Sequence, residues 1–335
     1  MFNLTIKGNF DDDYVESALK ELDEKIKIPR NVEQILIIDN PKYYKVIEPH
    51  IPKEARKEFR KAYQEDPTSM SLTYDKFDLI IISVSLKEEA YLKHNKKAFI
   101  GLLAHELMHI TQRRRHLDRS IRADAIKTFK KFEPKLRNLP ISQPIIADFF
   151  ASIGESANFT LKDIYDNFEL INKGMGDYIL EDYWNLYTKN KRFIKPIFYS
   201  DDDTAYKLIK NVKSAIDFEL NLISAIVPFV RMARNGDKRA KKLVEYIADN
   251  YEVNINEVAN AYDEVIQYAI KNFRWRSDFR QGFFRLVFKR ALYLLSNLKI
   301  DEARHAHVVK PTHTETEIII KKTKKKGVKV TRRRK

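Results

Sequence analysis

Cysteine is absent from the 335 residues of this chain. Its absence excludes disulfide bonds, thiolate zinc sites and cysteine nucleophiles, and it is typical of proteins from a reducing compartment. The sequence also lacks a run of about 20 apolar residues, so no membrane-spanning helix is predicted. Residues 1–13 contain neither the basic nor the apolar region of a signal peptide. We therefore expect a cytoplasmic protein.

Acidic residues are missing from the end of the chain. The formal net charge is +15, but residues 321–335 contain ten Lys or Arg and no acid, which leaves about +5 for residues 1–320. Apolar residues make up 44% of the sequence and charged residues 33%, a balance typical of a globular protein with one large domain or two. We expect residues 301–335 to form a basic, disordered tail.

The first third of the sequence alternates between strand and helix patterns. Short strands are predicted at 2–7 and 32–39, with an amphipathic helix at 11–28 between them. Residues 69–74 and 77–85 are predicted to pair as a hairpin across Asp75-Lys76. These elements predict a small mixed or antiparallel sheet within residues 1–117.

From about residue 95 onward, almost every segment has apolar residues at helical spacing. Helices are predicted near 118–136, 144–173, 176–190, 202–234, 237–249, 253–273 and 277–299. The expected fold class is therefore α+β. Its N-terminal sheet packs on one central helix, and a mainly helical subdomain follows at residues 118–300.

That central helix, residues 98–110, carries His105, Glu106 and His109 in an apolar run that Asn95 is predicted to cap. Positions i and i+4 share one helix face roughly 6 Å apart, so both imidazoles can bind one metal ion. The alternative is a buried core helix whose histidines are satisfied by hydrogen bonds. That alternative leaves the Glu among apolar neighbours unexplained, because a lone buried charge is costly.

The pattern resembles the H-E-x-x-H motif of the zincin metallopeptidases, and in particular their gluzincin branch. The resemblance implies a Zn²⁺ cofactor held by His105 and His109, with Glu106 as the general base of peptide-bond hydrolysis. Such a site needs a third protein ligand. His116 follows the motif, but residues 110–115 contain no Gly or Pro. On a continuous helix His116 would lie roughly 10 Å along the axis from His109, too far to share the ion.

In gluzincins, a carboxylate from a later helix completes the site, and an acid four residues further on holds a ligating histidine. The nearest equivalent here is Asp163 as the ligand, with Asn167 in place of the second acid. Because ligands converge in space rather than in sequence, other acids remain open as third ligand: Glu169, Glu181, Glu155, Asp124 and Asp182.

The resemblance also implies how neighbouring residues act. Zinc in such a site lowers the pKa of a water molecule towards about 7, and Glu106 moves the proton to the leaving amine. Strand 69–74 or 77–85 would hold the peptide as an added strand. Arg113, four residues after His109, either recognises an anionic substrate group or lies on a solvated helix face. Three tyrosines either assist the oxyanion or pack in the core: Tyr178, Tyr183 and Tyr187.

The tail Lys321–Lys335 predicts a second kind of partner. Its charge favours non-specific binding to nucleic acid or an anionic surface, and its lack of aromatic residues argues against base-specific recognition. A merely solubilising tail is the alternative. A different function class therefore stays open beside the peptidase, namely a non-enzymatic or nucleic-acid-associated protein with a structural metal site.

Overall fold

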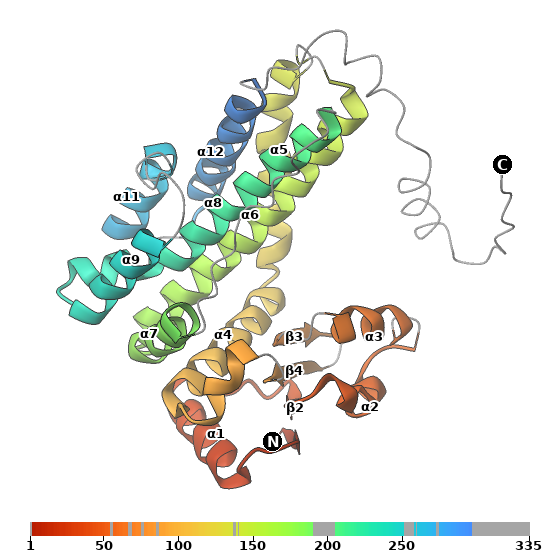
Figure 1. The fold of residues 1–335 in the computed structure, drawn as a ribbon, viewed down its shortest axis with the longest axis vertical. Coiled ribbons are helices and arrows are strands. Elements are labelled where there is room, and N and C mark those ends of the chain that lie inside the picture. The colour runs from red at the N-terminus through yellow and green to blue at the C-terminus, as the bar shows by residue number, and fades with distance from the viewer. Residues whose placement is uncertain are drawn as a thin grey trace, which may run out of the picture.

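The computed structural model describes residues 2–53, 56–65, 69–74, 77–84, 87–136, 139, 141–189, 205–250, 258, 260–272 and 275–296. It has an α+β fold, in which a small sheet near the N-terminus is followed by a mainly helical region (Figure 1). This confirms the predicted fold class. Residues 301–335, predicted as a basic tail, lie outside the described residues, as do residues 190–204.

The sheet has the strand order β1-β2-β4-β3. Strands β1 (Asn3–Lys7), β2 (Val32–Ile38) and β4 (Asp78–Ser83) are parallel, and β3 (Met70–Thr73) runs antiparallel to β4. The sheet is therefore mixed, and the predicted pairing of 69–74 with 77–85 is confirmed. The two central strands, β2 and β4, are almost wholly buried apolar runs, as expected where helices cover both faces.

Alternate residues of β2 and β4 enter two different cores. One set packs with α1 (Asp12–Ile26) and α4 (Lys96–Arg114), and includes Ile35, Ile37, Ile80 and Ile82. The other set packs with α2 (Tyr44–Ile47) and α3 (Arg56–Glu65), and comprises Leu36, Ile38, Leu79 and Ile81. Short helical turns connect these layers: η1 (Pro41–Tyr43), η2 (Glu48–His50) and η3 (Lys87–Lys93).

Helix α4 links the sheet to the helical region. The side chain of Asn95 caps it by accepting a hydrogen bond from the Ala98 amide. Gly101 allows α7 (Gly176–Trp184) to approach closely, because a Cβ at this position would overlap the carbonyl oxygen of Tyr178. The helix ends at Arg114, and His116 adopts a left-handed conformation with φ 57° before α5 (Leu117–Leu136) begins. The chain thus turns here without a glycine, so the continuous helix assumed for residues 110–116 is wrong.

Four long helices form most of the helical region: α5, α6 (Gln143–Asn172), α8 (Ala205–Arg234) and α12 (Ser277–Ser296) (Figure 1). Buried ion pairs join α12 to its neighbours, with 2.6 Å from Arg280 Nε to Asp124 Oδ2 and 2.8 Å from Arg290 Nη2 to Glu219 Oε1. A π-helix, η4 (Asn185–Lys189), extends α7, and α9 (Lys238–Asn250) and α11 (Asp263–Asn272) complete the described helices. Among the described residues, no helix is both long and apolar enough to cross a membrane.

Candidate metal centre

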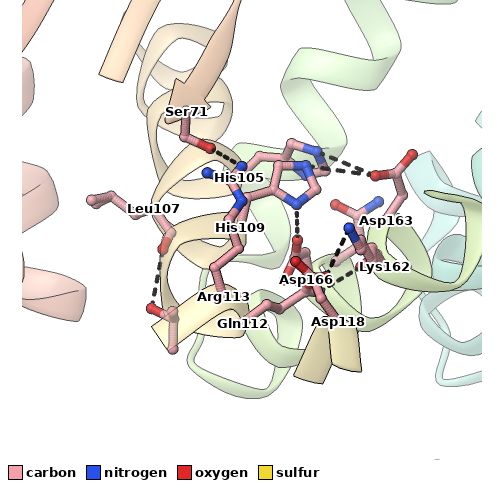
Figure 2. A network of polar contacts seen from close by, with 12 residues as sticks. Ser71, His105, Leu107, His109, Gln112, Arg113, Asp118, Lys162, Asp163 and Asp166 are labelled. Atoms are coloured by element: carbon pink, nitrogen blue, oxygen red, sulfur yellow. Dashed lines mark hydrogen bonds and ion pairs between the residues drawn. The ribbon is translucent and has the colours of Figure 1, made fainter. Parts of the chain in front are cut away.

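The structure brings His105, His109 and Asp163 together. The two histidines lie one turn apart on α4, and the aspartate faces them from α6 (Figure 2). Asp163 Oδ1 lies 3.8 Å from His105 Nε2 and 3.6 Å from His109 Nε2. The three ligand atoms all lie within 4.8 Å of one another. The third group comes from the part of the chain that the sequence favoured, about 54 residues after His109.

This geometry fits a tetrahedral zinc ion. Bonds of about 2.0–2.1 Å from zinc to nitrogen or oxygen place neighbouring ligand atoms roughly 3.4 Å apart. The two His–Asp distances, 3.6 and 3.8 Å, are close to that spacing. The side chains of the histidines are 16% and 18% exposed and that of Asp163 is 36% exposed. The group is therefore neither sealed in the core nor spread over the surface, which suits a centre that a substrate can reach.

Asp166 holds His109 in the orientation that a metal requires. Its Oδ2 lies 2.7 Å from His109 Nδ1, and its side chain is completely buried (Figure 2). Gln112, one turn further along α4, donates from Nε2 to the other oxygen of Asp166 at 2.7 Å and to the carbonyl of Lys162 at 3.0 Å. A proton kept on Nδ1 by the carboxylate leaves Nε2 of His109 free to face Asp163. This is the carboxylate–histidine arrangement that supports metal ligands.

The role expected of Asn167 is therefore wrong. Asn167 Nδ2 donates to the hydroxyl of Tyr183 at 2.8 Å, and its Oδ1, the expected acceptor, has no hydrogen-bond partner among the described residues. Asp166, three residues after Asp163 rather than four, takes that role. The sequence signal for it is weak, because Asp163 and Glu169 lie three residues to either side, and only the structure shows that Asp166 is buried beside Ile164, Tyr165 and Phe168. The same cost of a buried charge that drew attention to Glu106 applies here.

The electrostatics of the cluster favour a positive charge. Burial lowers the pKa of His109, but the carboxylates of Asp166, Glu106 and Asp163 together raise it more, to about 9. Burial raises the pKa of Asp166, against the opposing effect of the two histidines. A histidine that keeps a proton well above neutral pH reports an excess of negative charge around it. Such surroundings also stabilise a divalent cation.

Glu106 lies on α4 between the two histidines and is only 5% exposed. Its charge contributes to the raised pKa of His109, so its carboxylate acts on the cluster electrostatically. Nδ1 of His105 is buried and lacks a hydrogen-bond partner among the described residues. Among the described residues, His105 therefore has no carboxylate that holds it as Asp166 holds His109.

The remaining acids considered as third ligands lie elsewhere. Glu181 pairs with Arg239 of α9 and accepts a hydrogen bond from Asn95, the residue that caps the far end of α4. Asp124 is bound by Arg280, and Asp182 accepts a hydrogen bond from Tyr91. Two more acids of α6 are absent from the cluster: Glu155 and Glu169. His116 is also absent from it.

Arg113 joins the centre to the sheet. Its guanidinium donates to Ser71 Oγ at 2.9 Å (Figure 2). It also donates to Thr73 Oγ1 at 3.2 Å. Both partners lie on β3, the last strand of the sheet. The side chain therefore fixes β3 against the end of α4 that carries the histidines. It does not lie on a solvated helix face.

Of the three tyrosines, Tyr183 and Tyr187 lie near the cluster. With Asp163 they line a cavity of about 180 Å³ between α6, α7, η4 and α8, together with Leu186, Asn221, Ser224 and Ala225. Burial, and then the charge of Asp163, raise the pKa of Tyr183 above its ordinary value, so its hydroxyl stays protonated. Tyr178 lies elsewhere and donates to Glu21 of α1.

No family model, curated protein or solved structure matches this chain. The resemblance to zincins therefore rests on the H-E-x-x-H motif of the sequence.

Proposed function

We propose that this protein is a zinc-dependent metallopeptidase, in which His105, His109 and Asp163 bind the ion. The observation that carries the proposal is the convergence of three ligand atoms within 4.8 Å, from two helices far apart in sequence. The buried Asp166 behind His109 strengthens it. A histidine that serves only the core needs no unpaired nitrogen facing a second histidine and a carboxylate.

Bound zinc would act as a Lewis acid and lower the pKa of a water molecule towards about 7. Glu106 would take the proton of this water and pass it to the amine that leaves. The hydroxyl of Tyr183, protonated and adjacent to Asp163, would donate to the oxygen on which negative charge develops. Strand β3 would pair with an extended substrate, because it is the last strand of the sheet and Arg113 holds it beside α4.

The test compares Glu106→Gln with the wild type on a quenched fluorescent peptide library. We expect the variant to bind zinc as the wild type does, while its hydrolysis falls by at least about a hundredfold. Glu16→Gln, at an exposed position on α1, is the matched control and should keep full activity. Zinc content is measured in both, and in His109→Ala, which should lose the metal.

Two results would reject the proposal. Full hydrolysis by Glu106→Gln would remove the general base from the mechanism. A protein that binds zinc through these residues but hydrolyses none of the library would favour the structural metal site considered above.

A further inference from the structure

A second cavity lies on the opposite side of α6 from the metal ligands. It has a volume of about 260 Å³ and lies between α5 and α6, and Phe288 of α12 also lines it. Asn158 lines it five residues before Asp163, which places the two side chains roughly 140° apart around the helix. The cavity is therefore separate from the candidate metal centre, and an inference about it does not rest on the proposed function.

The cavity has an apolar end and a polar end. Helices α5 and α6 are antiparallel: Asp118 pairs with Lys162 at one point, and the rings of Phe129 and Phe150 lie 6.0 Å apart further along. The apolar end is formed by Phe129, Phe150, Phe288, Ala147 and Ala151. The polar end, towards the Asp118–Lys162 pair, is formed by Arg122, Glu155 and Asn158.

Asn158 is the residue that points to a ligand. Its side chain lines the cavity, the residue is only 5% exposed, and its Oδ1 has no hydrogen-bond partner within the described part of the chain. A buried acceptor left unpaired costs about 1–3 kcal/mol, so folded proteins rarely retain one without a use. The occupant must therefore bring a hydrogen-bond donor to this point.

The surface around the cavity favours a protein as the occupant. Ile126, which lines the cavity, is 58% exposed, and Phe159, next to Asn158, is 63% exposed. Ile126 therefore adds exposed apolar surface at the cavity itself, and exposed apolar surface beside a hollow marks interaction sites. The cavity is smaller than the roughly 300–1,000 Å³ typical of drug-sized ligands. A single large apolar side chain from a partner suits it better.

The charge of α5 indicates the sign of that partner. The exposed charged residues of this helix include one acid, Glu133, and six bases: Arg119, Arg122, Lys127, Lys130, Lys131 and Lys135. Its two other acids are already neutralised, Asp118 by Lys162 and Asp124 by Arg280. Arg119 is three residues before Arg122, and Lys130 is four after Ile126, so both lie on the face that borders the cavity. The acid of the lining, Glu155, lies on α6, so an acidic segment complements the border on the α5 side.

We propose that the α5–α6 cavity binds an extended, acidic peptide segment of a partner protein. One large apolar side chain of the segment fills the end lined by Phe129, Phe150 and Phe288. A backbone amide beside it donates to Asn158 Oδ1, which an extended segment can do because its amides are not used within a helix. Acidic side chains of the segment lie over Arg119, Arg122 and Lys130.

The experiment measures fluorescence anisotropy of a fluorescein-labelled Asp-Glu-Phe-Glu-Asp peptide with the full chain. It is done in the Glu106→Gln background, so that hydrolysis cannot consume the probe. We expect Ala151→Trp, which fills the cavity, and Asn158→Leu, which removes the acceptor, each to weaken binding about tenfold. Ala123→Trp, at an exposed position of α5 outside the cavity, should bind as the parent does. Higher ionic strength should weaken binding in every protein.

Thermal unfolding separates this role from a structural one. Asn158→Leu should be at least as stable as its parent, because it removes an unpaired buried acceptor. Unchanged affinity in Ala151→Trp would overturn the proposal, as would equal binding of the same peptide with Ala in place of Phe. If Ala151→Trp instead converts a dimer into a monomer in sedimentation, the cavity is a self-association surface and the proposal is wrong.

Discussion

Replacement of Asp166 by Asn tests the candidate metal centre at the point where its geometry is most demanding. Both oxygens of Asp166 face a donor: Oδ2 lies 2.7 Å from His109 Nδ1 in an ion pair, and Oδ1 accepts a hydrogen bond from Gln112 Nε2 at 2.7 Å. An amide has one oxygen and one NH₂ group, so it must place a donor against one of these donors. Gln112 cannot rotate its amide to compensate, because its Nε2 also binds the carbonyl of Lys162. The substitution is nearly isosteric, yet it breaks this network.

The expected magnitude follows from the loss of orientation at His109. Removal of a residue that supports a metal ligand costs about 10- to 100-fold in metal affinity, which corresponds to about 1.4–2.8 kcal/mol. We expect Asp166→Asn to lose zinc affinity in this range, measured by competition with a chromophoric chelator. In the metal-free protein the pKa of His109 should fall from about 9, because burial lowers it and the Asp166 charge that raises it is gone. Imidazole NMR resonances followed against pH report this shift.

Two controls make the experiment decisive. Asp124→Asn removes another buried carboxylate that binds an arginine, so it tests the general cost of such a loss. It should destabilise the fold but leave zinc affinity unchanged. Asn167→Ala tests the position that the sequence favoured and should also leave zinc affinity within about threefold, because Asn167 contacts Tyr183 instead. Zinc affinity of Asp166→Asn within twofold of the wild type would refute the reasoning.

Three further outcomes follow from the same contacts. Gly101→Ala should destabilise the fold by about 1–3 kcal/mol, because its Cβ meets the backbone of α7. Gly282→Ala has open space around its Cβ and should stabilise α12 by up to about 1 kcal/mol. Thermal unfolding measures both effects. Tyr183→Phe should lower kcat while zinc affinity and KM stay near the wild-type values, which steady-state kinetics and metal titration would measure. In the metal-free protein, the raised pKa of His109 adds stability that is fully present below pH 6.5 and is lost as the pH rises through about 9. The free energy of unfolding, measured with denaturant, should therefore fall over this window. The fall should be smaller in Asp166→Asn.

Much of the fold could be predicted because local patterns decide it. Residues 144–173 have apolar spacing of three and four, and the structure has α6 at Gln143–Asn172. The strand at 32–39 matches β2 at Val32–Ile38. The strand order was less accessible, because parallel pairing of β1, β2 and β4 joins segments separated by whole helices. The apolar runs of β2 and β4 did carry a signal, since strands buried on both faces are typical of parallel sheets.

The candidate site shows where sequence spacing stops being informative. His105 and His109 share one helix, so the 3.6-residue repeat alone predicts that their side chains meet. Asp163 and Asp166 also share one helix, but their roles depend on how α6 crosses α4. One carboxylate reaches Nε2 of both histidines from the open side, and the other reaches Nδ1 of His109 from the core. A spacing of three or four would serve equally well on an isolated helix. The crossing of the two helices selects three, and it does so through Gln112, whose bonds to Lys162 and Asp166 fix one helix against the other.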